Sequence, residues 1–507
     1  MVNRKEWISY ILVSLCCAVY LFFRLTAGNT YTHPDELISL KIIENIAKTG
    51  HWDSNWALAN LPPWFKSDQY TFSSYILTSA VMTKYSVLHI FKPNIDIRIH
   101  LRLHSVLFHV ITILLTYAVG KSLFNSRRTG IAAAWFVAIF PLLFQDSLYA
   151  RPESFTTMLT LLLVLLLTRQ YQKPGMPGFF IMGGLIGFLV AAKITFLVLL
   201  ALPCIIGLGH QNLKRWFYIQ LTGVFGIGLG IGFALGAPYA LVNWSSYLHG
   251  LTILFSKYAG EHRPYGLPNG NILERLAYSR HYFSAIGAGW FIFLAVWGWL
   301  LLLKKRLYVF LAVGLFFLVV VYFSIKPVFF ERNFSFAIPF LSMCVGFVIF
   351  RCIDHLSSKQ IIRIALSGVI IAAVCAPLLL FLWKLDTEVL SGRHEKQRQE
   401  LQTKLQNQYG GQTVFSGWEL NDFNPHEWSN MQIFYDRQNT IYEICGANDT
   451  YTRNFIALAC RDLGLRVITE LPSPFQANGL PPSTLYTYHA PQYFYLVHIK
   501  NPSGPSR

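Results

Sequence analysis

Hydrophobic residues are gathered into long runs along this chain, and polar residues fill the segments between them. A helix needs about 20 apolar residues to cross a bilayer. Eleven runs are candidates for such spans, at 7–23, 99–120, 130–147, 153–168, 178–192, 195–209, 216–236, 285–303, 308–325, 334–350 and 362–383. Because an unpaired backbone amide is costly in lipid, each run is expected to be helical. The pattern predicts a mainly α polytopic membrane protein.

A twelfth run, 72–91, contains several hydroxyl residues, a lysine and a histidine, so its length alone does not place it. If it lies along the membrane surface, the short loops on the N-terminal side hold every tight basic cluster: Lys121/Arg127/Arg128, Arg169/Lys173, Lys214/Arg215, Lys304/Lys305/Arg306 and Arg351/Lys359/Arg363. If it crosses, all of these clusters face outward. Positively charged loops are usually cytoplasmic. We therefore predict about eleven spans, with the N-terminus inside and the C-terminus outside.

This topology divides the chain into two predicted domains. Residues 1–383 would form the transmembrane domain, and its main external segments would be 24–98, 148–152, 237–284 and 326–333. Residues 384–507 begin with a polar helical stretch and continue with short strand-like runs such as TIYEICG and QYFYLVHI. Alternating runs of this kind predict a small extracytoplasmic α/β domain.

Composition agrees with a membrane protein and argues against a nucleic-acid-binding one. Hydrophobic residues make up 53% of the 507 residues and charged residues 13%, whereas soluble domains carry about 25% charge. The net charge of +17 is distributed in short clusters between apolar runs. That distribution is typical of membrane loops, so no nucleic-acid partner is predicted.

Paired acids follow the first span. Asp35 and Glu36 come after His33 and Pro34, and they precede an amphipathic pattern that predicts a helix. Pro34 suits the first turn of that helix, and acids are favourable near its N-terminal end. From spacing alone the two acids could simply stabilise the helix start. Adjacent acids beside a membrane can also bind a divalent metal or remove a proton from a hydroxyl.

A second charged cluster lies at the start of the fourth span. Asp146, Arg151 and Glu153 bring both signs of charge to the edge of the bilayer. An acid at a span boundary is often only an interfacial residue. Charges within or beside the hydrocarbon region are nevertheless costly, which favours a functional interpretation.

Basic residues at the external ends of later spans are candidates for anion binding. Lys193 lies between two short apolar runs, and it either extends to the interface or has an anionic partner. That partner could be a lipid phosphate or an internal carboxylate, with Glu153 and Asp146 as the candidates. Lys326 and Arg332 share a short loop with Glu331. Arginine suits phosphate oxygens, although either base could simply pair with Glu331.

The loop 257–284 contains His262 and Arg263 among other charged residues, together with Gly and Pro. A loop of this kind could become ordered over a substrate. His33 and His262 are far apart in the sequence and do not form a zinc pattern. We expect both to act as hydrogen-bonding residues at a substrate site.

Five motifs in a fixed order resemble the GT-C superfamily of membrane glycosyltransferases, over roughly residues 7–350. They are THPDE at 32–36, HLRLHSVLF at 100–108, DSLYARPE at 146–153, GFLVAAK at 187–193 and ERNFSFAIP at 331–339. The pattern is similar to that of protein O-mannosyltransferases and of the bacterial transferases that add aminoarabinose to lipid A. The HPDE string is also similar to mannosyltransferases of the glycolipid-anchor pathway. The tail from 384 carries no such resemblance.

The resemblance implies that a sugar passes from a polyprenyl-phosphate donor to a hydroxyl of a glycan, lipid or protein outside the cytoplasm. Asp35 would be the general base, with Glu36 beside it, and Lys193 and Arg332 would stabilise the phosphate leaving group. The other candidate substrate-binding residues are His33, Asp146, Arg151, Glu153, Lys326, His262 and Arg263. No cofactor is assigned, and a divalent metal at Asp35 and Glu153 is left open. A bacterial plasma membrane with an outward-facing site is the expected location.

Two other classes of membrane protein could share some of these features. A transporter or flippase for a lipid-linked saccharide would also need many spans and intramembrane charges. The large charged external segments and the lack of an internal repeat count against it. A non-catalytic membrane scaffold would not need Lys193 and both acidic motifs on one face.

Overall fold

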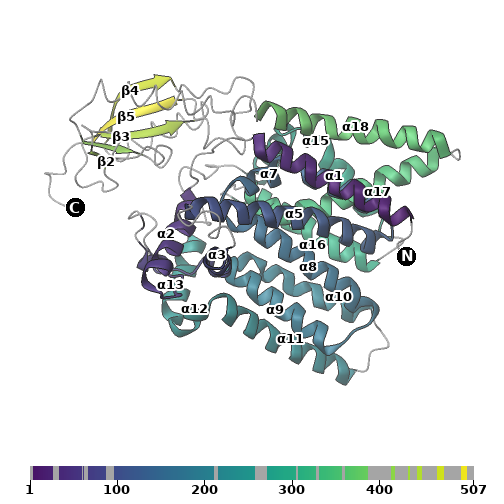
Figure 1. Cartoon of the computed structure of the whole chain (residues 1–507), viewed down its shortest axis with the longest axis horizontal. Helices are drawn as coiled ribbons and strands as arrows, with labels where there is room; N and C mark the ends of the chain where they lie inside the picture. Colours follow the sequence, from purple (N-terminus) through teal and green to yellow (C-terminus); the bar gives the residue numbers. More distant parts are fainter. Residues whose placement is uncertain are drawn as a thin grey trace.

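The computed structural model describes the helical part of the chain over residues 4–26, 34–59, 61, 67–86, 96–209, 215–256, 271–303, 307–326, 331–356 and 360–385. Beyond these it describes only five strands, within 413–499. The helical body is a bundle of mostly long helices (Figure 1). Its long helices coincide with the apolar runs of the sequence, as expected where backbone hydrogen bonds must be satisfied within each segment. The predicted external segments 24–98 and 237–284 also contain helices, and the last of these, Ile272–Ala285, occupies the end of the predicted loop 257–284.

The first half of the bundle surrounds one long central helix, α5. This helix contacts α1, α2, α3, α6, α7, α8 and α17. The elements as far as Ala192 are α1 (Arg4–Thr26), α2 (Pro34–Thr49), η1 (Trp56–Leu58), α3 (Ser73–Lys84), α5 (Ile97–Phe124), α6 (Arg127–Ile139), α7 (Pro141–Leu148), α8 (Pro152–Gln172) and α9 (Met176–Ala192).

The second half continues the same architecture. Its elements are η2 (Ile194–Leu200), α10 (Ala201–Gly209), α11 (Arg215–Gly236), α12 (Pro238–Val242), α13 (Trp244–Ser256), α14 (Ile272–Ala285), α15 (Gly289–Leu300), α16 (Leu307–Ser324), η4 (Glu331–Ala337), α17 (Ile338–Leu356) and α18 (Gln360–Leu385). In Figure 1, α2, α3, α12 and α13 gather at one end of the body and the N-terminus lies at the other.

Among the described residues, six helices are long and apolar enough to cross a membrane, or up to eight if each of two bent pairs is one span. The bent pairs are α6 with α7, at 55°, and α14 with α15, at 108°. Three shorter apolar helices lie where the remaining spans were predicted: Met176–Ala192, Ile194–Gly207 and Gly368–Trp383. The chain is a mostly helical membrane protein, and the number of eleven spans stays a prediction.

The ambiguous segment 72–91 contains a helix of only 12 residues, α3. At 1.5 Å per residue, such a helix is about 18 Å long, short of the roughly 30 Å of a hydrocarbon core. Its N-terminal end is tied to α9 by a hydrogen bond of 2.9 Å from the Phe72 N–H to the Ala192 carbonyl. This length supports placement of α3 at the membrane surface.

At the end of the bundle opposite to α2 and α3, ion pairs link helix α1, the turn between α5 and α6, and the end of α17. Arg127 lies 3.0 Å from Glu6, and Lys121 lies 3.7 Å from the same carboxylate. Arg128 lies 3.5 Å from Asp354. The N-terminus, the 121–128 turn and the end of α17 therefore share one end of the bundle, and the positive-inside rule predicts that this end is cytoplasmic.

This arrangement predicts the outcome of cysteine labelling. In a background in which all eight native cysteines are replaced by serine, Arg128→Cys should react with a membrane-impermeant maleimide only when the cytoplasmic face is accessible. Thr49→Cys, at the exposed end of α2, should react from the opposite side and serves as the control. Labelling of Arg128→Cys from outside intact cells would contradict the topology.

Close packing of α9 against α11 fixes the position of Lys193. A Cβ on Gly183 would collide with the Phe225 carbonyl, and one on Gly187 with the Leu229 carbonyl. Small residues let two membrane helices approach to backbone contact. The C-terminal end of α9, and with it Lys193, is thereby held in a constant place.

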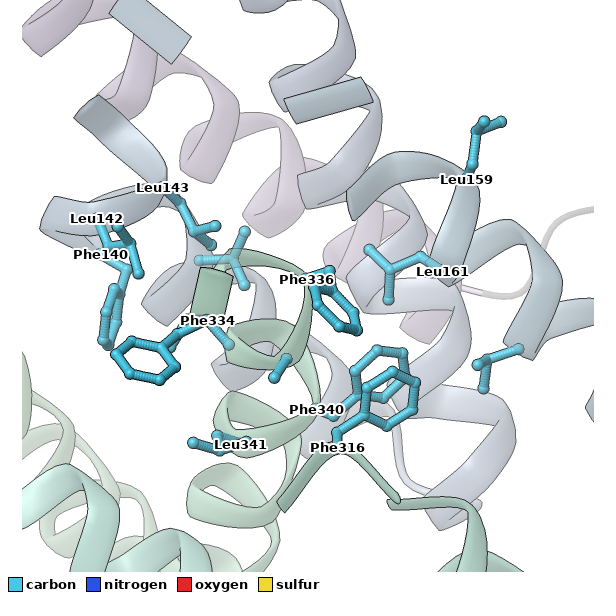
Figure 2. Close-up of a cluster of buried hydrophobic side chains, with 14 of the residues drawn as sticks. Phe140, Leu142, Leu143, Leu159, Leu161, Phe316, Phe334, Phe336, Phe340 and Leu341 are labelled. Atoms are coloured by element: carbon cyan, nitrogen blue, oxygen red, sulfur yellow. The ribbon is translucent and has the colours of Figure 1, made fainter. Parts of the chain in front are cut away.

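A cluster of aromatic and aliphatic side chains surrounds η4 (Figure 2). Phe316 and Phe340 stack with ring centroids 3.7 Å apart. From η4, Phe334 lies on the side of Phe140, and Phe336 packs against Phe196 at 4.7 Å. This packing anchors η4 beside α7 and α8, where the charged residues lie.

The described part of the tail is a five-stranded mixed sheet with the order β2-β1-β3-β5-β4. Its strands are β1 (Thr413–Ser416), β2 (Gln432–Ile433), β3 (Tyr442–Ala447), β4 (Leu465–Pro472) and β5 (Tyr493–Ile499). β1 pairs in parallel with β2 and β3, and β5 pairs antiparallel with β3 and β4. The predicted polar helix at the start of the tail lies outside the described residues, so an α/β domain at 384–507 stays a prediction.

Candidate functional site

The first acidic motif opens α2. Pro34 is the first residue of this helix, and Asp35 and Glu36 follow within its first turn. The predicted apolar face is buried: Ile38, Ile42, Ile43 and Ile46 are each at most 4% exposed. The side chain of Asp35 and the whole of His33 lie outside the described residues. The backbone nevertheless places Asp35 directly beside Glu36.

Glu36 is tied to two other parts of the chain. Its carboxylate is 0% exposed and accepts hydrogen bonds from Arg102 Nε at 2.7 Å and Arg102 Nη2 at 2.8 Å. A third bond, of 3.0 Å, comes from the Ala150 N–H. With both oxygens hydrogen-bonded in this way, the Glu36 carboxylate connects α2 to α5 and to the Tyr149–Arg151 segment. The same bonds leave it poorly placed to act as a free base.

Arg102 was not among the predicted site residues. Its only signal was the Arg-Leu pair near the start of the span at 97–124, and nothing in the spacing linked it to Glu36, 66 residues earlier. The pair joins the first acidic motif to the second, since Ala150 directly precedes Arg151.

Asp146 lies near the end of the short helix α7. The bend at Phe140 and Pro141 sends α7 away from the axis of α6, and every residue of α7 is buried. The hydroxyl of Ser335, from η4, donates to Asp146 Oδ2. This bond joins the second acidic motif to the late external segment, and Ser335 was not among the predicted residues.

Glu153 stands between two cations at the start of α8. Lys193 Nζ lies 2.6 Å from Glu153 Oε1, and Arg151 Nε lies 3.2 Å from Glu153 Oε2. Arg151 and Glu153 are at most 2% exposed, and the Lys193 side chain is 15% exposed. Lys193 therefore forms an ion pair with an internal carboxylate, that of Glu153, which was one of the partners predicted for it.

Arg332 and Lys193 line the same narrow pocket. Its walls also include Glu153, Asn333 and Ser335. The enclosed cavity is about 10 Å³, which is room for no more than about one water molecule. Lys193 and Arg332 thus line one pocket, and their joint contact with a phosphate stays a prediction. A phosphate could enter only if side chains such as Lys193 and Glu153 move apart.

Other predicted residues are placed less completely. Lys326 lies just beyond α16, and its ammonium sits 4.7 Å from the ring centroid of Tyr322. It is not among the residues that line the pocket. His262 and Arg263 lie outside the described residues, so their contact with a substrate stays a prediction.

The predicted metal site has one described member. Glu153 already faces the cations Lys193 and Arg151, which lowers its tendency to attract a third. Within the described ranges, no group of three His, Cys, Asp or Glu residues is arranged to hold a metal ion. A metal at Asp35 and Glu153 stays a prediction, because the Asp35 side chain is not described.

Comparisons with known proteins agree with this arrangement. Residues 74–239 match the family described as dolichyl-phosphate-mannose-protein mannosyltransferase. A crystal structure of ArnT from Cupriavidus metallidurans is similar at a TM-score of 0.54 and 11% identity, covering 99% of this chain and 100% of that one. The chain thus has the fold of this transferase, and about a third of its length is similar to the mannosyltransferase family.

The oligosaccharyltransferase of Archaeoglobus fulgidus also shares the fold of this chain. Its crystal structure matches at a TM-score of 0.53 and 12% identity, over 87% of this chain and 69% of that one. At such identities the likeness concerns the fold. No curated protein matches by sequence. The resemblance to GT-C glycosyltransferases drawn from the motifs is confirmed.

Proposed function

We propose that this protein is a GT-C glycosyltransferase that transfers a sugar from a polyprenyl-phosphate donor to a hydroxyl group of a glycan, lipid or protein acceptor. The observation that carries the proposal is the buried cluster in which the cations Lys193, Arg151 and Arg332 surround Glu153, with the carboxyl groups of Asp146 and Glu331 nearby. Three cations gathered at one bundle end suit the phosphate of a lipid-linked donor, which would compete with these carboxyl groups for them. This end lies opposite the basic loops, so the reaction is assigned to the extracytoplasmic face.

Two structural neighbours support the choice of donor. The Cupriavidus ArnT structure contains undecaprenyl phosphate. The Archaeoglobus oligosaccharyltransferase AglB, with a TM-score of 0.50 and 12% identity over 88% of this chain and 70% of that one, is in complex with a dolichol-phosphate. Both ligands are polyprenyl phosphates, the class inferred for this chain. A bacterial plasma membrane remains our proposed location.

Within the site we assign separate tasks to the two acids of the first motif. Asp35 removes the proton from the acceptor hydroxyl as the oxygen attacks the anomeric carbon. The bond from that carbon to the phosphate oxygen breaks, and the phosphate leaves with its negative charge near Lys193 and Arg332. Glu36 holds the start of α2 through Arg102, so it positions Asp35 and takes no proton.

The proposal is tested by incubating the purified protein with labelled polyprenyl-phosphate sugars and candidate acceptors. A transferase should release polyprenyl phosphate and form a labelled product. A transporter or flippase would instead move intact donor across a vesicle bilayer, and a scaffold would do neither. Movement of intact donor without any product, across the sugars and acceptors supplied, would overturn the proposal.

A further inference from the structure

A second cavity, away from the charged site, lies at the opposite end of the bundle. It encloses about 620 Å³, which is within the range of pockets that bind small molecules. It is a groove lined by residues of α5, by residues of α1 and by Gln172 at the end of α8. Nothing in the transfer reaction uses this groove.

Polarity changes along the groove in one direction. Lys121, Ser122 and Asn125 lie at the end of α5, level with Gln172. Leu114 lines the opposite end of the groove. At 1.5 Å per residue, the 11 positions between Leu114 and Asn125 correspond to about 16 Å along the helix. The groove therefore has a polar mouth at the end of the bundle and a mostly apolar interior, in which Ser14 of α1 is a polar residue.

The mouth of the groove carries excess positive charge. The Lys121 ammonium lies 3.7 Å from Glu6, and the same carboxylate oxygen lies 3.0 Å from Arg127. One carboxylate thus faces two cations. Further basic residues, Arg169 and Lys173, follow at the end of α8. A phosphate placed beside Lys121 would balance this charge.

On this basis we propose that the groove between α1, α5 and α8 binds an anionic glycerophospholipid of the cytoplasmic leaflet. Its phosphate would contact Lys121, with Asn125 and Gln172 as polar neighbours. Its acyl chain would follow Tyr117 and Ala118 toward Leu114. The cytoplasmic surface of a membrane is rich in anionic lipids, which basic segments attract.

The test compares lipids retained by the purified protein, using phosphatidylglycerol and phosphatidylcholine as probes and native mass spectrometry as the readout. The wild-type protein should retain phosphatidylglycerol in preference to phosphatidylcholine. Lys121→Ala should weaken phosphatidylglycerol binding about tenfold, because it removes a charge-assisted contact. Ala118→Phe should lower it by filling the groove, and melting temperatures show whether each variant is folded.

Arg128→Ala is the matched control. Arg128 is a cation at the same end of the bundle, 59% exposed, and it does not line the groove. Its loss should leave lipid retention unchanged. Equal effects of Lys121→Ala and Arg128→Ala would mean general surface attraction and would overturn the site. Displacement of phosphatidylglycerol by polyprenyl phosphate, or equal retention of phosphatidylcholine, would overturn the choice of ligand.

Discussion

Asp35→Asn should reduce sugar transfer by about 10²–10⁴-fold, the usual effect of removing a general base. Asparagine keeps the size and polarity of the side chain but accepts no proton at neutral pH. Because α2 is held in place by the hydrogen bonds between Arg102 and Glu36, the Asp35→Asn variant should fold and bind donor as the wild type does. Initial rates of product formation, together with donor affinity, measure the effect.

The control for Asp35→Asn is Glu44→Gln on the same helix. Glu44 is 41% exposed and pairs with Lys41 at 2.8 Å. An exposed pair of this kind contributes little to stability, so its loss should leave transfer near normal. Near-normal turnover of Asp35→Asn would show that this acid only stabilises the start of α2.

The second large effect is expected from Arg102→Ala. It leaves the fully buried Glu36 carboxylate with only the Ala150 N–H as a described partner. Removing one member of a buried ion pair typically costs about 3–5 kcal/mol of folding free energy. The melting temperature in detergent should fall sharply. Transfer should fall with it, since α2 and the Tyr149–Arg151 segment lose their connection.

Arg128→Ala provides the comparison for this loss. Its partner Asp354 is 51% exposed, and exposed pairs contribute at most about 1 kcal/mol. The double variant Glu36→Gln with Arg102→Gln should recover part of the stability, because no buried charge is left without a partner. If Arg102→Ala lowers the melting temperature no more than Arg128→Ala does, the pair of Arg102 and Glu36 does not hold α2 in place.

The sequence predicted the positions of the helices well, because long apolar runs in a membrane have helix as their main solution. It did not predict the bend between α6 and α7 at Pro141, nor that α10 is preceded by the 3-10 helix Ile194–Leu200. These departures place Asp146 and Lys193 at element ends. They depend on local packing that apolar periodicity does not contain.

Within the site, sequence reasoning found residues but only part of their pairing. Glu153 was considered as the partner of Lys193, since both lay at external span ends. The bond from Arg102 to Glu36 and the bond from Ser335 to Asp146 join residues 66 and 189 positions apart. No spacing rule relates such residues, so these contacts required the folded bundle.

The central claim is that the pocket of Lys193 and Arg332 receives a lipid phosphate, and the most direct measurement is the affinity for polyprenyl phosphate. Lys193→Ala should weaken it at least about tenfold, while Lys84→Ala, an exposed lysine on α3 at the same end of the bundle, should not. The melting temperature of Lys193→Ala should also fall, since Glu153 loses its partner at 2.6 Å. A lowered melting temperature with unchanged affinity for polyprenyl phosphate would contradict the claim.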